Sequence, residues 1–181
     1  MKKVFYAIIL LALLQSCVSQ QVAIRDYSTE HVAIPFQATE IYIKDSRTNK
    51  QPMNWDLPAI ATKQLSVTGS PELTSADIQL LTSIVKKSES ANGTPAKITV
   101  RLLEGTCNIY ADWSKAKEFT KVAIELEVEE LNGQRYFKSN AEVFYEYGTL
   151  NALEDSVVKA YKLALKNATH QSLKQLPSQV N

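Results

Sequence analysis

The stretch that decides the fold is VAIELEVEELNGQRYFKSNAEVF, residues 122–144. Its first half alternates apolar and polar side chains with a period of two, the pattern of a strand with one buried face. Asn132-Gly133 in the middle is the preferred pair for a two-residue type I′ turn. The stretch therefore predicts a β-hairpin that reverses at this turn.

The turn also determines which residues of the two strands lie opposite each other. It places Val128 opposite Phe137 on the apolar face and Glu127 opposite Lys138 on the polar face. Turn chemistry, apolar pairing and charge pairing thus predict the same register. The other apolar pairs are Ile124 with Ala141 and Val122 with Val143.

Upstream of the hairpin, residues 96–113 also alternate, but the parity of the apolar positions changes after Gly105. One face cannot stay buried through that change unless the strand bulges, and we place the bulge near Glu104 and Gly105. The bulge puts Cys107 on the buried face. We therefore interpret this thiol as buried and inert, with an intermolecular disulfide as the alternative.

Two amphipathic helices are predicted on either side of these strands. Thr74 and Asp77 have the spacing of a capping box before the first helix, which Asn92-Gly93 should end. The second helix runs from about residue 150 to 173, and its alanines are typical of close packing on a sheet rather than of a helix lying on a membrane. Its apolar positions are Leu150, Leu153, Val157, Tyr161, Ala164 and Ala168.

The remaining segments complete the fold prediction. Residues 31–45 predict a strand in which Pro35 marks an edge or a break. Residues 45–52 predict a loop, 63–67 a short strand and 68–71 a turn. Together these elements predict an α+β two-layer sandwich, with two helices packed on one face of an antiparallel sheet of four or five strands.

The strongest functional signal lies at the N-terminus. Two lysines precede an uncharged run at 4–14, which is shorter than the roughly 20 residues that span a bilayer but suits an export signal. The next residues, LLQSC (13–17), resemble a bacterial lipobox, with Leu14 three positions before Cys17 and Ser16 directly before it. This resemblance implies cleavage before Cys17 and attachment of a diacylglycerol to its sulfur. An ordinary secretory signal with an incidental cysteine is the alternative.

Processing at this point would divide the chain into a signal peptide (1–16), a lipidated Cys17 with its tether (17–30) and a single periplasmic domain (31–181). Two of the 20 Lys and Arg lie in the signal, so 18 basic side chains face 19 acidic ones in the mature chain. Such a chain has no electrostatic basis for binding nucleic acid. The non-acidic VSQQ after the lipobox favours the periplasmic face of the outer membrane.

The order of elements and several segments resemble the YajG type of small bacterial envelope lipoprotein. This resemblance implies a family with no assigned chemistry, and related two-helix, one-sheet lipoproteins act as accessory parts of envelope machines. The present chain departs from it by a longer segment, containing Trp and Pro, before the first helix. The matching features are Cys17, IYIKDSR (41–47), ITVRLLEG (98–105), VAIELEVEELNGQRY (122–136) and LNALEDSVVKAYKLALKNA (150–168).

No motif for catalysis is visible, since HExxH, GxSxG, CxxC, P-loop and GxGxxG patterns are all missing and the only histidines are His31 and His170. The glutamates at alternate positions of 125–129 lack a nearby histidine, so we interpret them as a solvated face rather than a metal site. We predict a non-catalytic protein without metal or cofactor, held on the membrane by its lipid and binding another envelope protein. The predicted interaction surface consists of Glu125, Glu127, Tyr136, Lys138 and Phe144.

Two alternative functions stay open. The first is a small-molecule or lipid binder that uses a cleft between helices and sheet, near Trp55 and Trp113. The second is an enzyme whose site is assembled from residues scattered along the sequence.

Overall fold

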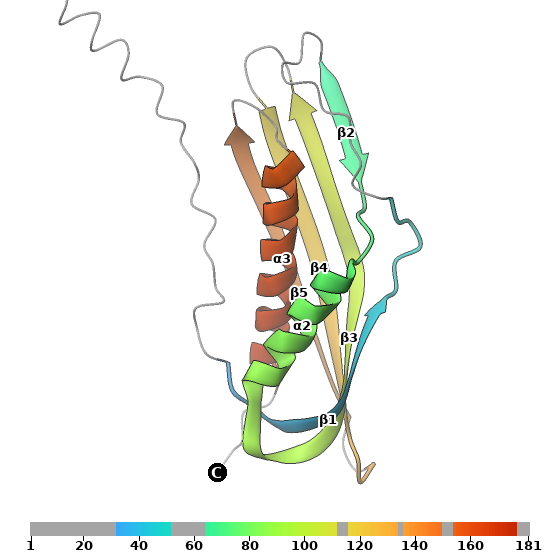
Figure 1. Ribbon diagram of the computed structural model, residues 1–181, viewed down its shortest axis with the longest axis vertical. Helices are drawn as coiled ribbons and strands as arrows, with labels where there is room; N and C mark the ends of the chain where they lie inside the picture. Colours follow the sequence, from blue (N-terminus) through green and yellow to red (C-terminus); the bar gives the residue numbers. More distant parts are fainter. Residues whose placement is uncertain (1–31, 52–63, 112–115, 134–135, 150–153, 177–181) are drawn as a thin grey trace, which may run out of the picture.

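The computed structural model describes residues 32–51, 64–111, 116–133, 136–149 and 154–176. These residues form five strands and two helices, and the helices contact each other along the sheet (Figure 1). In chain order the elements are β1 (Ile34–Asp45), β2 (Leu65–Gly69), α2 (Ser75–Ser88), β3 (Glu89–Ala111), β4 (Ala116–Glu130), β5 (Tyr136–Thr149) and α3 (Glu154–Lys174).

The fold is α+β, with an open and mostly antiparallel sheet. Four strands follow the order β1-β3-β4-β5, and β2 pairs with the C-terminal end of β3. The prediction of a wholly antiparallel sheet is wrong for one pair, because β1 and β3 run parallel. The chain passes through α2 before it enters β3, and such a crossover is what allows a later strand to pair in parallel.

The register of the predicted hairpin is confirmed. β4 and β5 pair antiparallel, with Val128 opposite Phe137. The turn is not type I′, because that type needs a positive φ at both central residues and, among the described residues, only Gly133 has one. Instead the Gly133 amide donates to the carbonyl oxygen of Glu130 at 2.8 Å. The other predicted pairs that are observed are Glu127–Lys138, Ile124–Ala141 and Val122–Val143.

β3 contains the predicted bulge, slightly earlier than expected. Its pairing with β4 shifts between Leu102 and Glu104, so Leu103 is the extra residue. Beyond the shift, Cys107 and Ile109 are fully buried. The change of parity in the sequence therefore marks a real bulge that keeps one face of a long strand in the core.

α2 begins with the predicted capping box. The Asp77 amide donates to Thr74 Oγ1 at 3.2 Å, and the Thr74 amide donates to Asp77 Oδ2 at 3.0 Å. The helix ends at Ser88, so the prediction that Asn92-Gly93 ends it is wrong. That dipeptide lies within β3, because pairing with β1 already begins at Glu89.

α3 packs on β4 and β5 and contacts α2, while α2 also contacts β1. The buried core cluster contains residues of both helices and of β1, β3 and β4. Leu150 and Leu153 of the predicted apolar face lie outside the described residues. Among the helices described, none combines the length and apolarity needed to cross a membrane. The predicted α3 positions found buried are Val157, Tyr161, Ala164 and Ala168.

The shorter predictions are mostly confirmed. The short strand predicted at 63–67 is β2, which extends to Gly69 and so takes in the first half of the predicted turn at 68–71. The predicted loop is observed over residues 46–51. Pro35 lies in β1 at an edge of the sheet, where the pairing with β3 is irregular between Ile34 and Phe36.

Candidate functional site

The predicted interaction surface lies on two neighbouring strands. Glu125 and Glu127 come from β4, while Tyr136 and Lys138 come from β5, with Glu127 directly opposite Lys138. Phe144 lies further along β5, and its side chain is outside the described part of the chain. The fold therefore brings four of the five predicted residues together.

An arginine that sequence reasoning missed organises this surface. Arg101 Nη2 lies 2.6 Å from Glu127 Oε2, and Arg101 Nε lies 3.7 Å from Glu125 Oε1. Lys138 Nζ lies 2.7 Å from the other oxygen of Glu125. Arg101 sits on β3 opposite Glu125. The signal that could have found it was the register between β3 and β4, which the sequence alone did not provide.

Of the three glutamates that the sequence predicts as a solvated face, Glu129 is exposed, but Glu125 and Glu127 are not. The side chains of Glu125 and Glu127 are only 10% and 18% exposed. The hydrogen bond from Arg101 lowers the pKa of Glu127, so this carboxylate stays ionised and paired. Tyr136 also hydrogen-bonds Glu127, and it is 59% exposed. The surface therefore combines a row of ion pairs across β3, β4 and β5, here called the ion-pair ladder, with the accessible aromatic ring of Tyr136.

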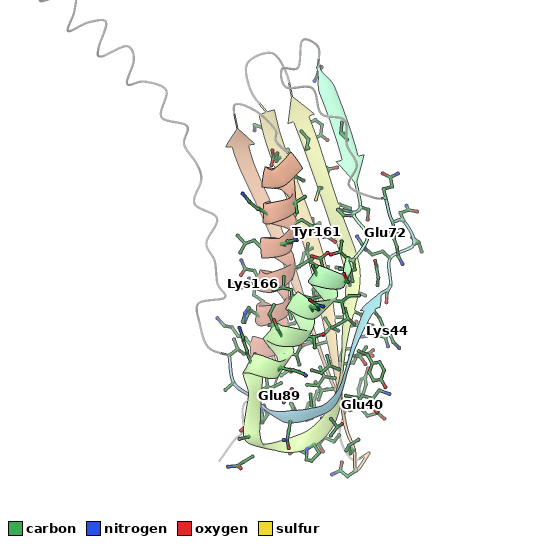
Figure 2. The ribbon with its side chains drawn as sticks, viewed as in Figure 1. Glu40, Lys44, Glu72, Glu89, Tyr161 and Lys166 are labelled. Atoms are coloured by element: carbon green, nitrogen blue, oxygen red, sulfur yellow. The ribbon has the colours of Figure 1, made fainter. Side chains whose placement is uncertain are left out.

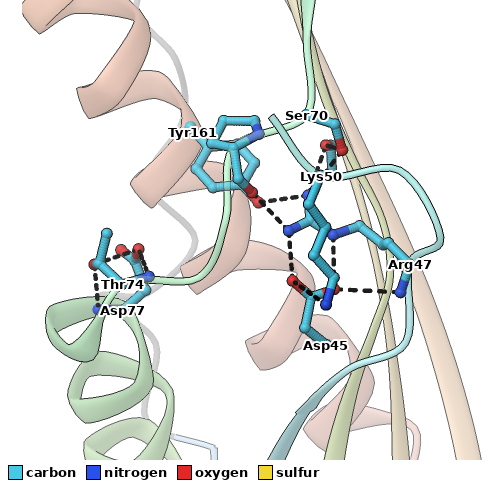
Figure 3. Close-up of polar contacts among 9 residues, drawn as sticks. Asp45, Arg47, Lys50, Ser70, Thr74, Asp77 and Tyr161 are labelled. Carbon is cyan, nitrogen blue, oxygen red and sulfur yellow. Dashed lines mark hydrogen bonds and ion pairs between the residues drawn. The ribbon is translucent and has the colours of Figure 1, made fainter. Parts of the chain in front are cut away.

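A second polar cluster surrounds Arg47, which is buried although it carries a full charge. Its Nε and Nη2 donate to the two carboxylate oxygens of Asp45, at 2.8 and 2.7 Å. Nη2 also donates to the carbonyl oxygen of Pro71 at 2.6 Å, and Nη1 donates to that of Gly105 at 2.9 Å. From α3, the Tyr161 hydroxyl approaches Nη1 to 3.4 Å, close to the start of α2 (Figures 2 and 3).

This cluster fills a gap in the pairing along one edge of β3. β1 pairs with β3 as far as Leu102, and β2 pairs with it from Cys107 onwards. In the gap, Arg47 and Ser70 both donate to the carbonyl oxygen of Gly105 at 2.9 Å. A Cβ atom on Gly105 would lie only 2.8 Å from Nη1 of Arg47, so any larger residue there would displace the end of this side chain. The DSR segment thus completes a sheet edge that neither strand covers.

A groove of about 650 Å³ opens beside the Arg47 cluster, between the loop at 47–51, the end of β2 and the bulge of β3. All five N–H groups of Arg47 already have protein acceptors, since Nε donates once and Nη1 and Nη2 each donate at least twice, so none is left to bind an anionic ligand. No group of His, Cys, Asp and Glu suited to a metal ion occurs among the residues described. We therefore assign the Arg47 cluster a structural role.

The predicted burial of Cys107 is confirmed, and the residue is a free thiol. Burial raises its pKa to about 11, which outweighs the opposing effect of the hydrogen bond that Thr120 Oγ1 donates to Sγ at 3.8 Å. The thiolate is the reactive form of cysteine. Cys107 therefore stays protonated at neutral pH and is poorly suited to act as a nucleophile.

Cys17, Trp55 and Trp113 lie outside the described residues, so lipid anchoring and the cleft between helices and sheet stay predictions. No protein-family model matches the chain, and no curated protein matches it significantly.

Proposed function

We propose that the protein is a lipoprotein on the periplasmic face of the outer membrane, and that its folded domain binds another envelope component without catalysing a reaction. The observation that carries this proposal is LLQSC at 13–17, directly after the uncharged run. Acyl chains contribute about 0.8 kcal/mol per buried CH₂, and two chains anchor a protein stably. The residues between Cys17 and Val32, where the described domain begins, can extend over at most about 50 Å.

We further infer that the two helices cover one face of the sheet as a two-layer sandwich and leave the other face open for binding. The contacts of α3 with β4, β5 and α2 support this arrangement. Exposed tyrosines, whose rings are apolar and whose hydroxyls are polar, are typical of binding surfaces. Large apolar side chains of the strands that are at least 40% exposed are Tyr42, Leu103, Tyr110 and Tyr136.

Cys17→Ser is expected to release the protein from the outer membrane, because serine offers no sulfur for the lipid. Wild-type protein should fractionate with outer membranes, and mass spectrometry of its N-terminus should find a diacylglyceryl group on Cys17. Cys107→Ser is the matched control, since it removes the other cysteine and should leave anchoring unchanged. An unmodified wild-type chain that begins at any other residue would contradict the anchoring proposal.

The binding proposal predicts that a photo-reactive amino acid at Tyr136 captures a different envelope protein in intact cells. Tyr136 is exposed and lies at the end of the ion-pair ladder, so its neighbourhood should contact the partner. The same amino acid at Lys86, an exposed position of α2, is the control and should capture much less. Capture of nothing, or only of a second copy of this chain, from position 136 would contradict binding of another component at this surface.

A further inference from the structure

The two edges of the sheet differ in how well they are protected against pairing with another strand. At one edge, β1 carries Pro35 and two irregularities in its pairing, and β2 has only 5 residues. Proline, bulges, short strands and charged side chains are the usual means by which monomeric proteins block such an edge, and of these β5 has only charged side chains, such as Lys138 and Glu142. β5, at the other edge, has 14 residues, contains no proline and pairs with β4 without a register shift.

The outer edge of β5 has no partner strand in the part of the chain that the structure describes (Figure 1). The N–H and C=O groups that point away from β4 are therefore a template for one more strand. This edge is long and regular, and the sequence of β5 shows which kind of strand would complement it.

β5 is complementary to itself when it is read outwards from Asn140 in both directions. One residue away from Asn140 on either side are the small residues Ser139 and Ala141. Two residues away are Lys138 and Glu142, which carry opposite charges. Three and four residues away are apolar or aromatic pairs, Phe137 with Val143 and Tyr136 with Phe144.

We propose that the outer edge of β5 pairs antiparallel with β5 of a second copy of this chain, about a two-fold axis at Asn140. This register places Lys138 opposite Glu142 of the other copy, and the symmetry makes that pair twice. A register centred on Lys138 or on Glu142 would instead place like charges opposite each other. This proposal goes beyond the proposed function and does not depend on the lipid anchor.

The charged side chains are available for these contacts. Lys138 is 47% exposed and Glu142 is 57% exposed, and Asn140 between them is exposed as well. Each already has an ion pair within its own chain, since Lys138 contacts Glu125 at 2.7 Å and Glu142 contacts Lys121 at 3.4 Å. In the dimer, the contact between Lys138 and Glu142 of the other copy would therefore connect the ion pairs of the two chains into one continuous row across the joined sheets.

Engineered cysteines test the register. Residues directly opposite in an antiparallel pair have Cα atoms about 4.5–5.5 Å apart, within the range that a disulfide bridges. The full chain carrying Asn140→Cys, expressed in cells and mildly oxidised, should therefore form a disulfide-linked dimer on a non-reducing gel. In Lys138→Cys or Glu142→Cys alone, the two cysteines would lie about 13 Å apart along the strands, and dimer should fall at least about tenfold.

Co-expression of the Lys138→Cys and Glu142→Cys chains should restore the linked dimer, because these positions lie opposite each other in the proposed register. The buried Cys107 is common to every variant and to the wild-type control. The proposal is overturned if Asn140→Cys crosslinks no more than the two single controls, or if it crosslinks only to a different protein.

A charge swap distinguishes pairing between copies from pairing within one chain. Lys138→Glu and Glu142→Lys should each weaken the dimer in sedimentation of the detergent-extracted protein, because each opposes like charges across the two-fold axis. The double variant should restore it. If these residues act only within one chain, the double variant breaks both internal ion pairs and should form the least dimer of the three variants. That result would contradict the proposal. A wild-type protein that sediments as a monomer at micromolar concentration would also overturn it.

Discussion

Replacing Arg47 with leucine is expected to lower the free energy of unfolding by about 3–5 kcal/mol, the usual cost of removing one partner of a buried ion pair. The substitution leaves the 14%-exposed Asp45 carboxylate with only the more exposed Lys50 nearby, and it takes a donor from the carbonyl oxygens of Pro71 and Gly105. These acceptors belong to β1, to the segment between β2 and α2, and to β3, so one change weakens the contacts of three parts of the fold. Urea unfolding followed by circular dichroism measures the loss.

Lys50→Ala is the matched control for Arg47→Leu. Lys50 Nζ lies 3.8 Å from the same Asp45 carboxylate, but its side chain is 36% exposed. Exposed ion pairs contribute little, so this variant should stay within about 1 kcal/mol of wild type. If the two variants lowered the free energy of unfolding equally, the buried Arg47 cluster would not stabilise the fold.

Acid provides a second measurement of the Arg47 cluster. Partial burial would raise the pKa of Asp45, but the hydrogen bonds from Arg47 outweigh it and lower this pKa below its usual value. A carboxyl whose pKa is lowered by folding stabilises the protein above its unfolded pKa of about 3.9, and this stabilisation is lost as pH falls through the folded pKa. Wild type should therefore lose this contribution below about pH 4, whereas Arg47→Leu should have none to lose.

The sequence predicts the hairpin register well because the residues that determine it are close together in the chain. Val128 and Phe137 share the apolar face, and Glu127 and Lys138 share the polar one, within a stretch of adjacent residues. A shift by one residue would turn every apolar side chain to the opposite face, so the alternation excludes every register shifted by an odd number of residues. The predicted turn type is wrong, but the register is the predicted one because the two strands still pair symmetrically about Asn132-Gly133.

The Arg47 cluster could not be predicted in the same way, because its contacts are distant in sequence. Gly105 lies 58 positions from Arg47 and Tyr161 lies 114 positions away. Composition marks 45–52 as a loop, yet nothing in that segment indicates that its arginine is buried. The parallel pairing of β1 with β3 was missed for a related reason, since the direction of β1 depends on a crossover rather than on its own residues.

The surface of β4 and β5 was predicted in part, better than the Arg47 cluster but less completely than the hairpin register. Sequence reasoning identified the correct strands and most of the residues, because the hairpin register is local. It missed Arg101, since the pairing of β3 with β4 depends on where the bulge falls. The interpretation of Glu125 as solvated was wrong for the same reason, because Arg101 and Lys138 close over it from both sides.

Gly93→Ala is expected to lower the free energy of unfolding by about 3 kcal/mol or more, at the upper end of what overpacking costs. A Cβ atom there would overlap the backbone carbonyl carbon of Phe36 and lie 2.8 Å from the amide nitrogen of Gln37. These atoms belong to β1 itself, so only a separation of β1 from β3 could relieve the contact. Such a movement would also disturb the packing of Phe36 on Phe137, whose ring centroids are 5.3 Å apart. Urea unfolding again measures the effect.

Two other alanine substitutions determine whether backbone overlap is the cause. Asn92→Ala changes the neighbouring exposed residue and should stay within about 0.5 kcal/mol of wild type. Gly105→Ala would meet the ends of the Tyr161 and Arg47 side chains, at 2.6 and 2.8 Å, and side-chain ends can move more easily than a strand. The expected order of losses is therefore Gly93→Ala, then Gly105→Ala, then Asn92→Ala. A loss at Gly93 no larger than at Asn92 would mean that β1 and β3 lie further apart there, and that Asn92-Gly93 has another role than close strand pairing.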